Sequence, residues 1–92
     1  MKTYQIKNIT NFKYKTIDDR KEWIGLFIVI KTLTEGERAE LPEVILMDNE
    51  YEFKSPYREI NTSAVQHIQQ IDSGILFATY SGTLYELTEI KT

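Results

Sequence analysis

Histidine and serine are the side chains of this sequence that could support nucleophilic catalysis. Such catalysis needs a nucleophile, a base within hydrogen-bond reach and a group that orients the base. Cysteine is absent and His67 is the single histidine, so any catalytic triad would depend on His67. The candidate nucleophiles Ser63, Ser73 and Ser81 lie in no nucleophile elbow or similar setting. We therefore predict that the protein is not an enzyme, and that His67 is solvent-facing or partly buried.

Carboxylates are the next residues with chemical potential, and they form two dense groups, at residues 18–22 and 48–52. A calcium loop needs a longer run of oxygen ligands with a glycine at its bend, and zinc sites need clustered histidine or cysteine. The four glycines are isolated from one another, which excludes a glycine-rich phosphate loop. The sequence therefore predicts no metal and no cofactor.

Basic and aromatic residues gather near the N-terminus. The members are Lys13, Tyr14, Lys15, Arg20, Lys21 and Trp23. Cations can hold phosphates while an aromatic ring stacks on a base. In a strand, however, Tyr14 would face away from Lys13 and Lys15, and the net charge of −3 disfavours binding to a polyanion. Direct nucleic-acid binding is not expected. The cluster remains the ligand site of an alternative function, a barrel that binds a small molecule or sequesters a signalling nucleotide.

Acidic and aromatic residues alternate further along the chain. Those that we predict to bind a partner are Glu50, Tyr51, Glu52, Phe53, Tyr57 and Arg58. Aromatic residues and arginine dominate the energetics of protein interfaces. Glu50 and Glu52 would form an anionic row beside Glu43 and Asp48, which could occupy a basic nucleic-acid channel on another protein. The same charges could instead keep an edge strand from aggregating. We interpret the protein as a non-enzymatic binder or inhibitor that covers a surface of its partner.

Length and composition predict one β-rich domain over residues 1–92. Aromatic residues make up 12% of the chain, and they favour pleated, half-buried surfaces. The absence of cysteine favours a reducing compartment, and the N-terminal residues contain no apolar signal segment. The longest apolar run, residues 23–30, is far below the ~20 residues of a membrane helix. We therefore expect a cytoplasmic protein without a membrane partner.

Alternating and continuous apolar segments predict short strands. They cover residues 4–6, 12–14, 23–30, 43–47, 51–53, 75–80 and 83–87. Residues 23–30 are apolar on both faces, which predicts a central strand covered on both sides and allows a homodimer. Pro42 should start the following strand, because proline cannot donate to a ladder. Ser81-Gly82 is typical of a hairpin turn.

Residues 62–71 allow two interpretations. Val65, Ile68 and Ile71 are spaced by three as on a helix face, whereas the segment is short for a helix and would serve equally well as a strand with a local bulge. We favour the strand. The predicted fold is all-β, with an α+β alternative containing one short helix near residues 62–71. Its architecture is a small, strongly bent antiparallel sheet or SH3-like barrel of about six strands.

The C-terminal third contains the segments Thr62-Ser63-x-Val65-x-x-Ile68 and Phe77-x-Thr79-x-Ser81-Gly82-x-x-Tyr85-x-Leu87. Together they resemble the last hairpin of small SH3-like β proteins encoded by phages and mobile elements of Gram-positive bacteria. The resemblance carries no catalytic residue. It implies a small barrel with an accessory role, such as an anti-defence protein in the host cytosol. The partner would then be a host protein, such as a nucleic-acid-binding or defence protein. A structural subunit of a phage particle is a further alternative.

Overall fold

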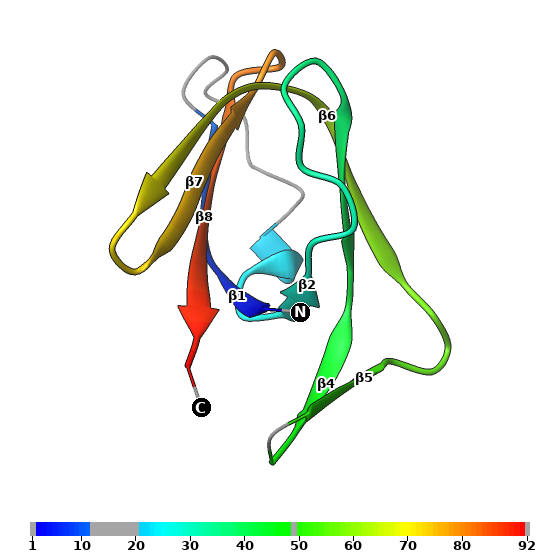
Figure 1. Ribbon diagram of the computed structural model, residues 1–92. Helices are drawn as coiled ribbons and strands as arrows, with labels where there is room; N and C mark the ends of the chain where they lie inside the picture. Colours follow the sequence, from blue (N-terminus) through cyan, green and yellow to red (C-terminus); the bar gives the residue numbers. More distant parts are fainter. Residues whose placement is uncertain (1, 12–20, 49, 92) are drawn as a thin grey trace.

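The computed structural model of this chain describes residues 2–11, 21–48 and 50–91, and these residues fold mainly into β-strands (Figure 1). The elements are β1 (Thr3–Asn11), η1 (Lys21–Trp23), β2 (Phe27–Val29), β3 (Arg38–Pro42), β4 (Val44–Met47), β5 (Glu50–Phe53), β6 (Glu59–Ile71), β7 (Gly74–Thr79) and β8 (Thr83–Ile90). The one helical element in these ranges is η1, a 3-10 helix of three residues. The predicted all-β class is therefore confirmed.

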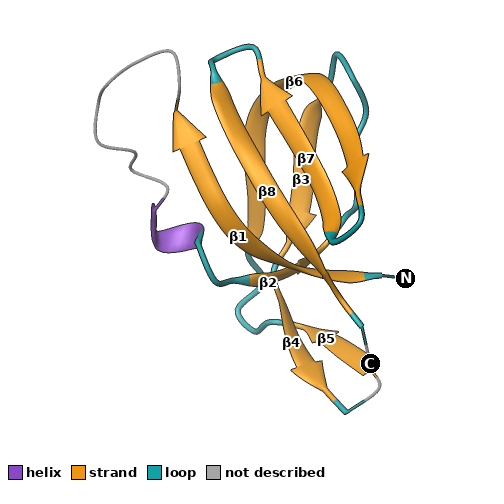
Figure 2. Ribbon diagram, turned by 90° about the vertical axis from the view of Figure 1, so that its left-hand side faces the viewer, coloured by secondary structure: helices purple, strands orange, loops and turns teal. Residues whose placement is uncertain are grey.

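Six of the strands form one antiparallel sheet in the order β2-β1-β8-β7-β6-β3, and it curls into a nearly closed barrel (Figure 2). The segment after β2 closes the gap to β3. Thr32 and Glu40 exchange backbone hydrogen bonds of 3.2 and 2.9 Å, and the N–H of Lys31 donates to the same Glu40 carbonyl at 3.0 Å. Closure of this kind leaves few exposed backbone groups at the sheet edges. β4 and β5 pair separately as a hairpin.

The interior of the barrel is filled by the inward-facing residues of its strands. Phe77 on β7 and Tyr85 on β8 are fully buried, and their rings stack with centroids 4.7 Å apart. The other buried members of this core are Tyr4, Ile6, Ile9, Ile28, Ala39, Leu41, Ile60, Val65, Ile75 and Leu87. Every second residue of β7 and β8 faces inward, as the period of a strand requires. The predicted hairpin of the C-terminal third is confirmed.

The segment with helical spacing is a strand. β6 runs for thirteen residues, pairing with β3 in its first half and with β7 in its second half. Its register with β7 shifts between Val65 and His67. A bulge adds one residue to the strand and so moves the inward face by one position. The separation of three between Val65 and Ile68 is therefore a strand period of two plus the bulge, as the favoured interpretation proposed.

The prediction of a central strand over residues 23–30 is wrong. Trp23 ends η1, Gly25 lies in a turn at φ +96°, and the strand covers only Phe27–Val29 at the edge of the sheet. Its two faces are apolar because β2 lies between the core and the β4–β5 hairpin: Ile28 and Val29 are both buried, and β2 contacts β4. Pro42 ends β3 and does not start the next strand.

Candidate functional site

The β4–β5 hairpin extends beyond the barrel in both views of the ribbon (Figures 1 and 2). The two strands pair from Val44 opposite Phe53 to Met47 opposite Glu50. Both strands were expected at these positions. Since neither strand belongs to the barrel sheet, the hairpin presents two faces.

Strand alternation divides the hairpin residues between these faces. One face carries Val44, Leu46, Tyr51 and Phe53, and the other carries Ile45, Met47, Glu50 and Glu52. The predicted anchors Tyr51 and Phe53 therefore point to the opposite side from Glu50 and Glu52. Glu50 and Glu52 therefore do not rim the aromatic rings, although all four residues were predicted to bind one partner.

Tyr51, Phe53 and Tyr57 form an aromatic cluster on the first face. The ring centroids of Tyr51 and Phe53 are 5.8 Å apart in an edge arrangement at 83°. Phe53 and Tyr57 are also 5.8 Å apart, at 60°. These distances lie in the range where edge-to-face pairs are favourable. Phe53 is 52% exposed and Tyr57 58% exposed, so the cluster offers a large accessible aromatic surface.

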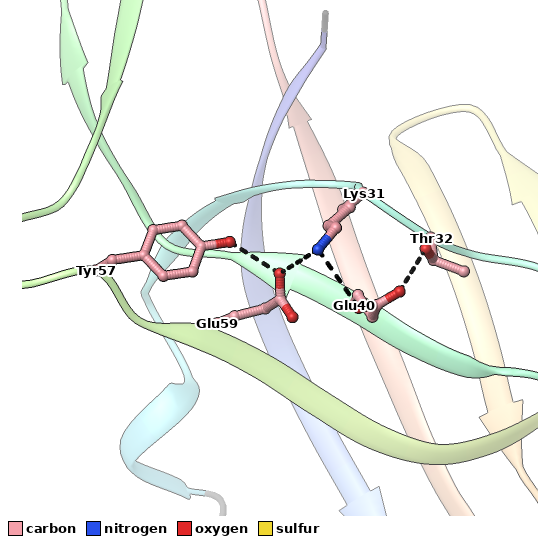
Figure 3. Close-up of polar contacts among 5 residues, drawn as sticks. All are labelled: Lys31, Thr32, Glu40, Tyr57 and Glu59. Carbon is pink, nitrogen blue, oxygen red and sulfur yellow. Dashed lines mark hydrogen bonds and ion pairs between the residues drawn. The ribbon is translucent and has the colours of Figure 1, made fainter.

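A chain of polar contacts holds the hydroxyl end of Tyr57 (Figure 3). The Tyr57 hydroxyl donates to Glu59 Oε1 at 2.8 Å, and Lys31 Nζ lies 3.5 Å from the same oxygen. Lys31 Nζ also lies 3.6 Å from Glu40 Oε2, while the Thr32 hydroxyl donates to Glu40 Oε1 at 2.7 Å. We call these five residues the Lys31 network. It fixes Tyr57 to the segment that closes the barrel.

The network shifts the ionisation of its members. The hydrogen bond to Glu59 raises the pKa of the Tyr57 phenol, because ionised Tyr57 could not donate it. The charges of Glu59 and Glu40 raise the pKa of Lys31. The hydroxyl of Thr32, and then the charge of Lys31, lower the pKa of Glu40. These shifts favour the charged forms of Glu40 and Lys31 and the neutral phenol of Tyr57.

An apolar pocket lies beside the aromatic cluster. Its volume is about 360 Å³, and it is lined by Val29, Ile30, Lys31, Pro42, Phe53 and Tyr57. Among the described residues that line it, Lys31 is the one with a charge, and its ammonium group is paired with Glu40 and Glu59. A pocket with these walls suits an apolar side chain better than an anion, because its cation is already neutralised.

Glu43 ties the base of the hairpin to the segment that carries Tyr57. Glu43 is only 4% exposed, and its carboxylate accepts hydrogen bonds from Arg58 Nε at 2.9 Å and Lys54 Nζ at 3.3 Å. We call these three residues the Glu43 ion-pair cluster. The expectation that Glu43 belongs to an exposed acidic row is wrong, because the fold buries it between two cations. Arg58 is likewise occupied by Glu43.

The residues proposed for a nucleotide site are only partly described. Lys13, Tyr14, Lys15 and Arg20 lie outside the described residues. Lys21 and Trp23 both lie on η1: Lys21 is exposed, whereas Trp23 is half-buried and packs against the core.

The residues considered for a triad are placed as follows. His67 is exposed on β6. The hydroxyls of Ser63 and Ser81 bond to each other at 2.7 Å, and Ser81 also bonds to Thr79 at 2.8 Å. Ser73 is exposed in the β6–β7 turn. The Ser63–Ser81 bond thus fastens the β7–β8 turn to β6.

Sequence reasoning missed several surface residues of this region. Ile45 and Met47 are 48% and 51% exposed on the second face of the hairpin. Val29 and Pro42 contribute to the pocket from strands that the sequence placed differently. The available signal was the continuous apolar run in β4, since a two-stranded hairpin cannot bury both of its faces.

Comparison with known proteins adds no relative. No protein-family model matches the chain, and no curated protein or solved structure is detectably similar to it. The resemblance to phage-encoded SH3-like proteins therefore stays a prediction. Across the described residues, no helix is both long enough and apolar enough to span a membrane.

Proposed function

We propose that the protein is a non-enzymatic binding module, an inhibitor that covers a functional surface of another protein with its aromatic cluster and the adjacent pocket. The observation that carries this proposal is the pair of exposed rings, Phe53 and Tyr57, which border an apolar pocket on a hairpin outside the barrel. Exposed aromatic residues beside a pocket are typical anchors of protein interfaces. The partner would insert an apolar side chain into the pocket.

The rigidity of Tyr57 supports binding. A surface side chain that becomes ordered on association costs about 0.5–1.5 kcal/mol. Tyr57 is already held at its hydroxyl by Glu59 and at its ring by Phe53. Much of the ordering cost is therefore met before the partner arrives.

The electrostatics of the pocket favour a protein over a nucleotide. A phosphate group needs uncommitted cations or backbone donors. Lys31 is shared by two carboxylates, and Lys54 and Arg58 are paired with buried Glu43. The resemblance in the C-terminal third implies that the partner is a host protein, with a defence or nucleic-acid-binding protein as the expected kind.

Site-specific photocrosslinking tests this proposal. A benzoylphenylalanine placed at position 57 would be irradiated in lysate of a Gram-positive bacterium, and the crosslinked protein identified by mass spectrometry. Tyr80 provides a matched control, because it is also 58% exposed but lies in the β7–β8 turn. We expect a discrete adduct from position 57 that position 80 does not give. The same adducts from both positions, or none from either, would contradict the proposal.

Affinity measurements with the purified partner complete the test. Tyr57→Ala and Phe53→Ala should each weaken binding at least about tenfold, the effect of losing a hot-spot residue of 1.4 kcal/mol or more. Tyr80→Ala should change the dissociation constant less than about twofold. A thermal-shift screen with nucleotides should leave the melting temperature unchanged, since only a ligand of the folded state raises it.

A further inference from the structure

The second face of the hairpin has a composition that its folding does not require. Ile45 lies directly opposite Glu52 and Met47 directly opposite Glu50, so the four side chains form one patch. Ile45 and Met47 remain about half exposed. We call this patch the apolar-acidic face. It lies on the reverse side of the hairpin from Tyr51 and Phe53.

The charge of this face is uncompensated within the described part of the chain. The ion pairs found there involve Glu40, Glu43, Glu59, Glu86 and Glu89, and none involves Glu50 or Glu52. Both residues are exposed and lie two positions apart on one strand, so their Cα atoms are about 6.6 Å apart. Their carboxylates are therefore available to a pair of cations from outside.

Protection of an edge strand against aggregation explains the two glutamates of this face but not Ile45 and Met47. Negative charge on an exposed strand prevents aggregation, and polar residues at positions 45 and 47 would serve that purpose better than isoleucine and methionine. Methionine adapts its shape to different partners. The long stems of lysine and arginine cover apolar surface while their charged ends reach anions. The apolar side chains of this face therefore fit the stems of lysine or arginine, and its carboxylates fit their charged ends.

We propose that the apolar-acidic face binds a cationic amphipathic segment of a protein, in which lysine or arginine alternates with apolar residues. The stems and apolar side chains of this segment cover Ile45 and Met47, and two of its cations pair with Glu50 and Glu52. Positions three or four apart on a helix face have Cβ atoms about 5–6 Å apart, which is close to the backbone spacing of about 6.6 Å between Glu50 and Glu52. This surface is independent of the aromatic cluster, so it stands or falls separately from the function proposed above.

Titration of the isotope-labelled protein with three synthetic 14-residue peptides tests the proposal by NMR. The first peptide combines lysine and leucine on opposite helix faces, the second replaces lysine by glutamate, and the third replaces leucine by serine. We expect the lysine-leucine peptide to shift the backbone amides of residues 45, 47, 50 and 52 most, and to bind at least about tenfold more tightly than either other peptide. Its affinity should fall with added salt.

Variants locate the interaction. The double substitution Glu50→Gln with Glu52→Gln should weaken lysine-leucine binding about tenfold or more. Ile45→Ser with Met47→Ser should do the same. Glu35→Gln with Glu37→Gln is the matched control, because these exposed acids have the same spacing but precede β3, and it should change affinity less than about twofold. Amide spectra of each variant verify its fold. An equal loss in the control, equal binding of the glutamate peptide, or shifts spread over the barrel would overturn the proposal.

Discussion

Replacing Glu43 by glutamine should loosen the hairpin at its base. The Glu43 carboxylate is buried, and it accepts one bond from Arg58 and one from Lys54. Backbone hydrogen bonds from the Glu43 N–H to the Arg58 carbonyl, and from the Lys54 N–H to the Glu43 carbonyl, join the same three residues. Glutamine keeps the shape and these backbone bonds. The substitution therefore isolates the contribution of the charge.

The expected loss in unfolding free energy follows from the burial of Glu43 and the partial exposure of Lys54 and Arg58. Hydrogen bonds to charged groups are worth about 1.5–3 kcal/mol each, and breaking a fully buried ion pair costs about 3–5 kcal/mol. The Lys54 and Arg58 side chains are nearly half exposed, so water can solvate them when the carboxylate is gone. The amide oxygen of glutamine retains one acceptor. We expect a loss of about 1–2 kcal/mol in the free energy of unfolding.

Urea denaturation at pH 7 measures this loss, and hydrogen exchange locates it. Amides of β4 and β5 should exchange faster while those of β7 and β8 keep their protection, because the lost contacts belong to the hairpin base. Glu86→Gln is the control, since its pair with Lys7 is a surface pair worth less than about 1 kcal/mol. If Glu43→Gln costs no more than Glu86→Gln, or if exchange accelerates equally throughout the barrel, the reasoning is refuted.

Three further predictions concern the barrel. Gly74→Ala should cost about 1–3 kcal/mol, because a Cβ there would overlap the carbonyl oxygen of Leu87, and an unchanged melting temperature would contradict that close approach. Phe77→Ala should cost about 3–5 kcal/mol in urea denaturation and Phe77→Leu clearly less, whereas equal losses would mean that the ring does not fill the core. The contribution of Glu40, whose folded pKa is lowered, should be present above its ordinary pKa of 4.5 and lost as pH falls through the folded pKa. That of Lys31, whose folded pKa is raised, should be present below 10.5 and lost as pH rises through the folded pKa. Denaturation of Lys31→Met across pH checks both limbs, and a difference from wild type that stays constant with pH would oppose this view.

The strands of the C-terminal third were predictable because their signals are local. Ser81-Gly82 separates two alternating segments, and Gly74 follows two polar turn residues. The segment containing Val65 and Ile68 was harder, since one bulge residue converts a period of two into a spacing of three. The short length of the segment favoured the strand, and the structure agrees.

The place of a strand in the sheet was not predictable from its own residues. Apolar side chains on both faces show that a strand is covered on both sides, but they do not identify what covers it. For β2, the second cover is the β4–β5 hairpin, so an edge strand has the composition of a central strand. Pro42 is tolerated as the last residue of β3, where its missing N–H interrupts little of the ladder.

The candidate site was likewise predictable only in part. Tyr51 and Phe53 share a face because they are two residues apart on one strand, and this spacing can be found from the sequence alone. The burial of Glu43 depends on cations eleven and fifteen residues away, whose approach requires the chain to turn back after the hairpin. The exposure of Ile45 and Met47 depends on the hairpin lying outside the barrel. Neither arrangement follows from local periodicity.

Closure of the barrel and the position of the aromatic cluster depend on the same residues. The backbone of Glu40 pairs with Thr32 to close the barrel, while its side chain holds Lys31, which in turn contacts Glu59. Tyr57 depends on Glu59 for its orientation, so the closed barrel sets the position of an exposed ring. The second face of the hairpin has no such link, because Glu50 and Glu52 bind nothing in the described barrel. Substitutions at Thr32 or Glu40, where the barrel closes, should therefore disturb the aromatic cluster. Substitutions at Glu50 or Glu52 should alter only what the apolar-acidic face binds.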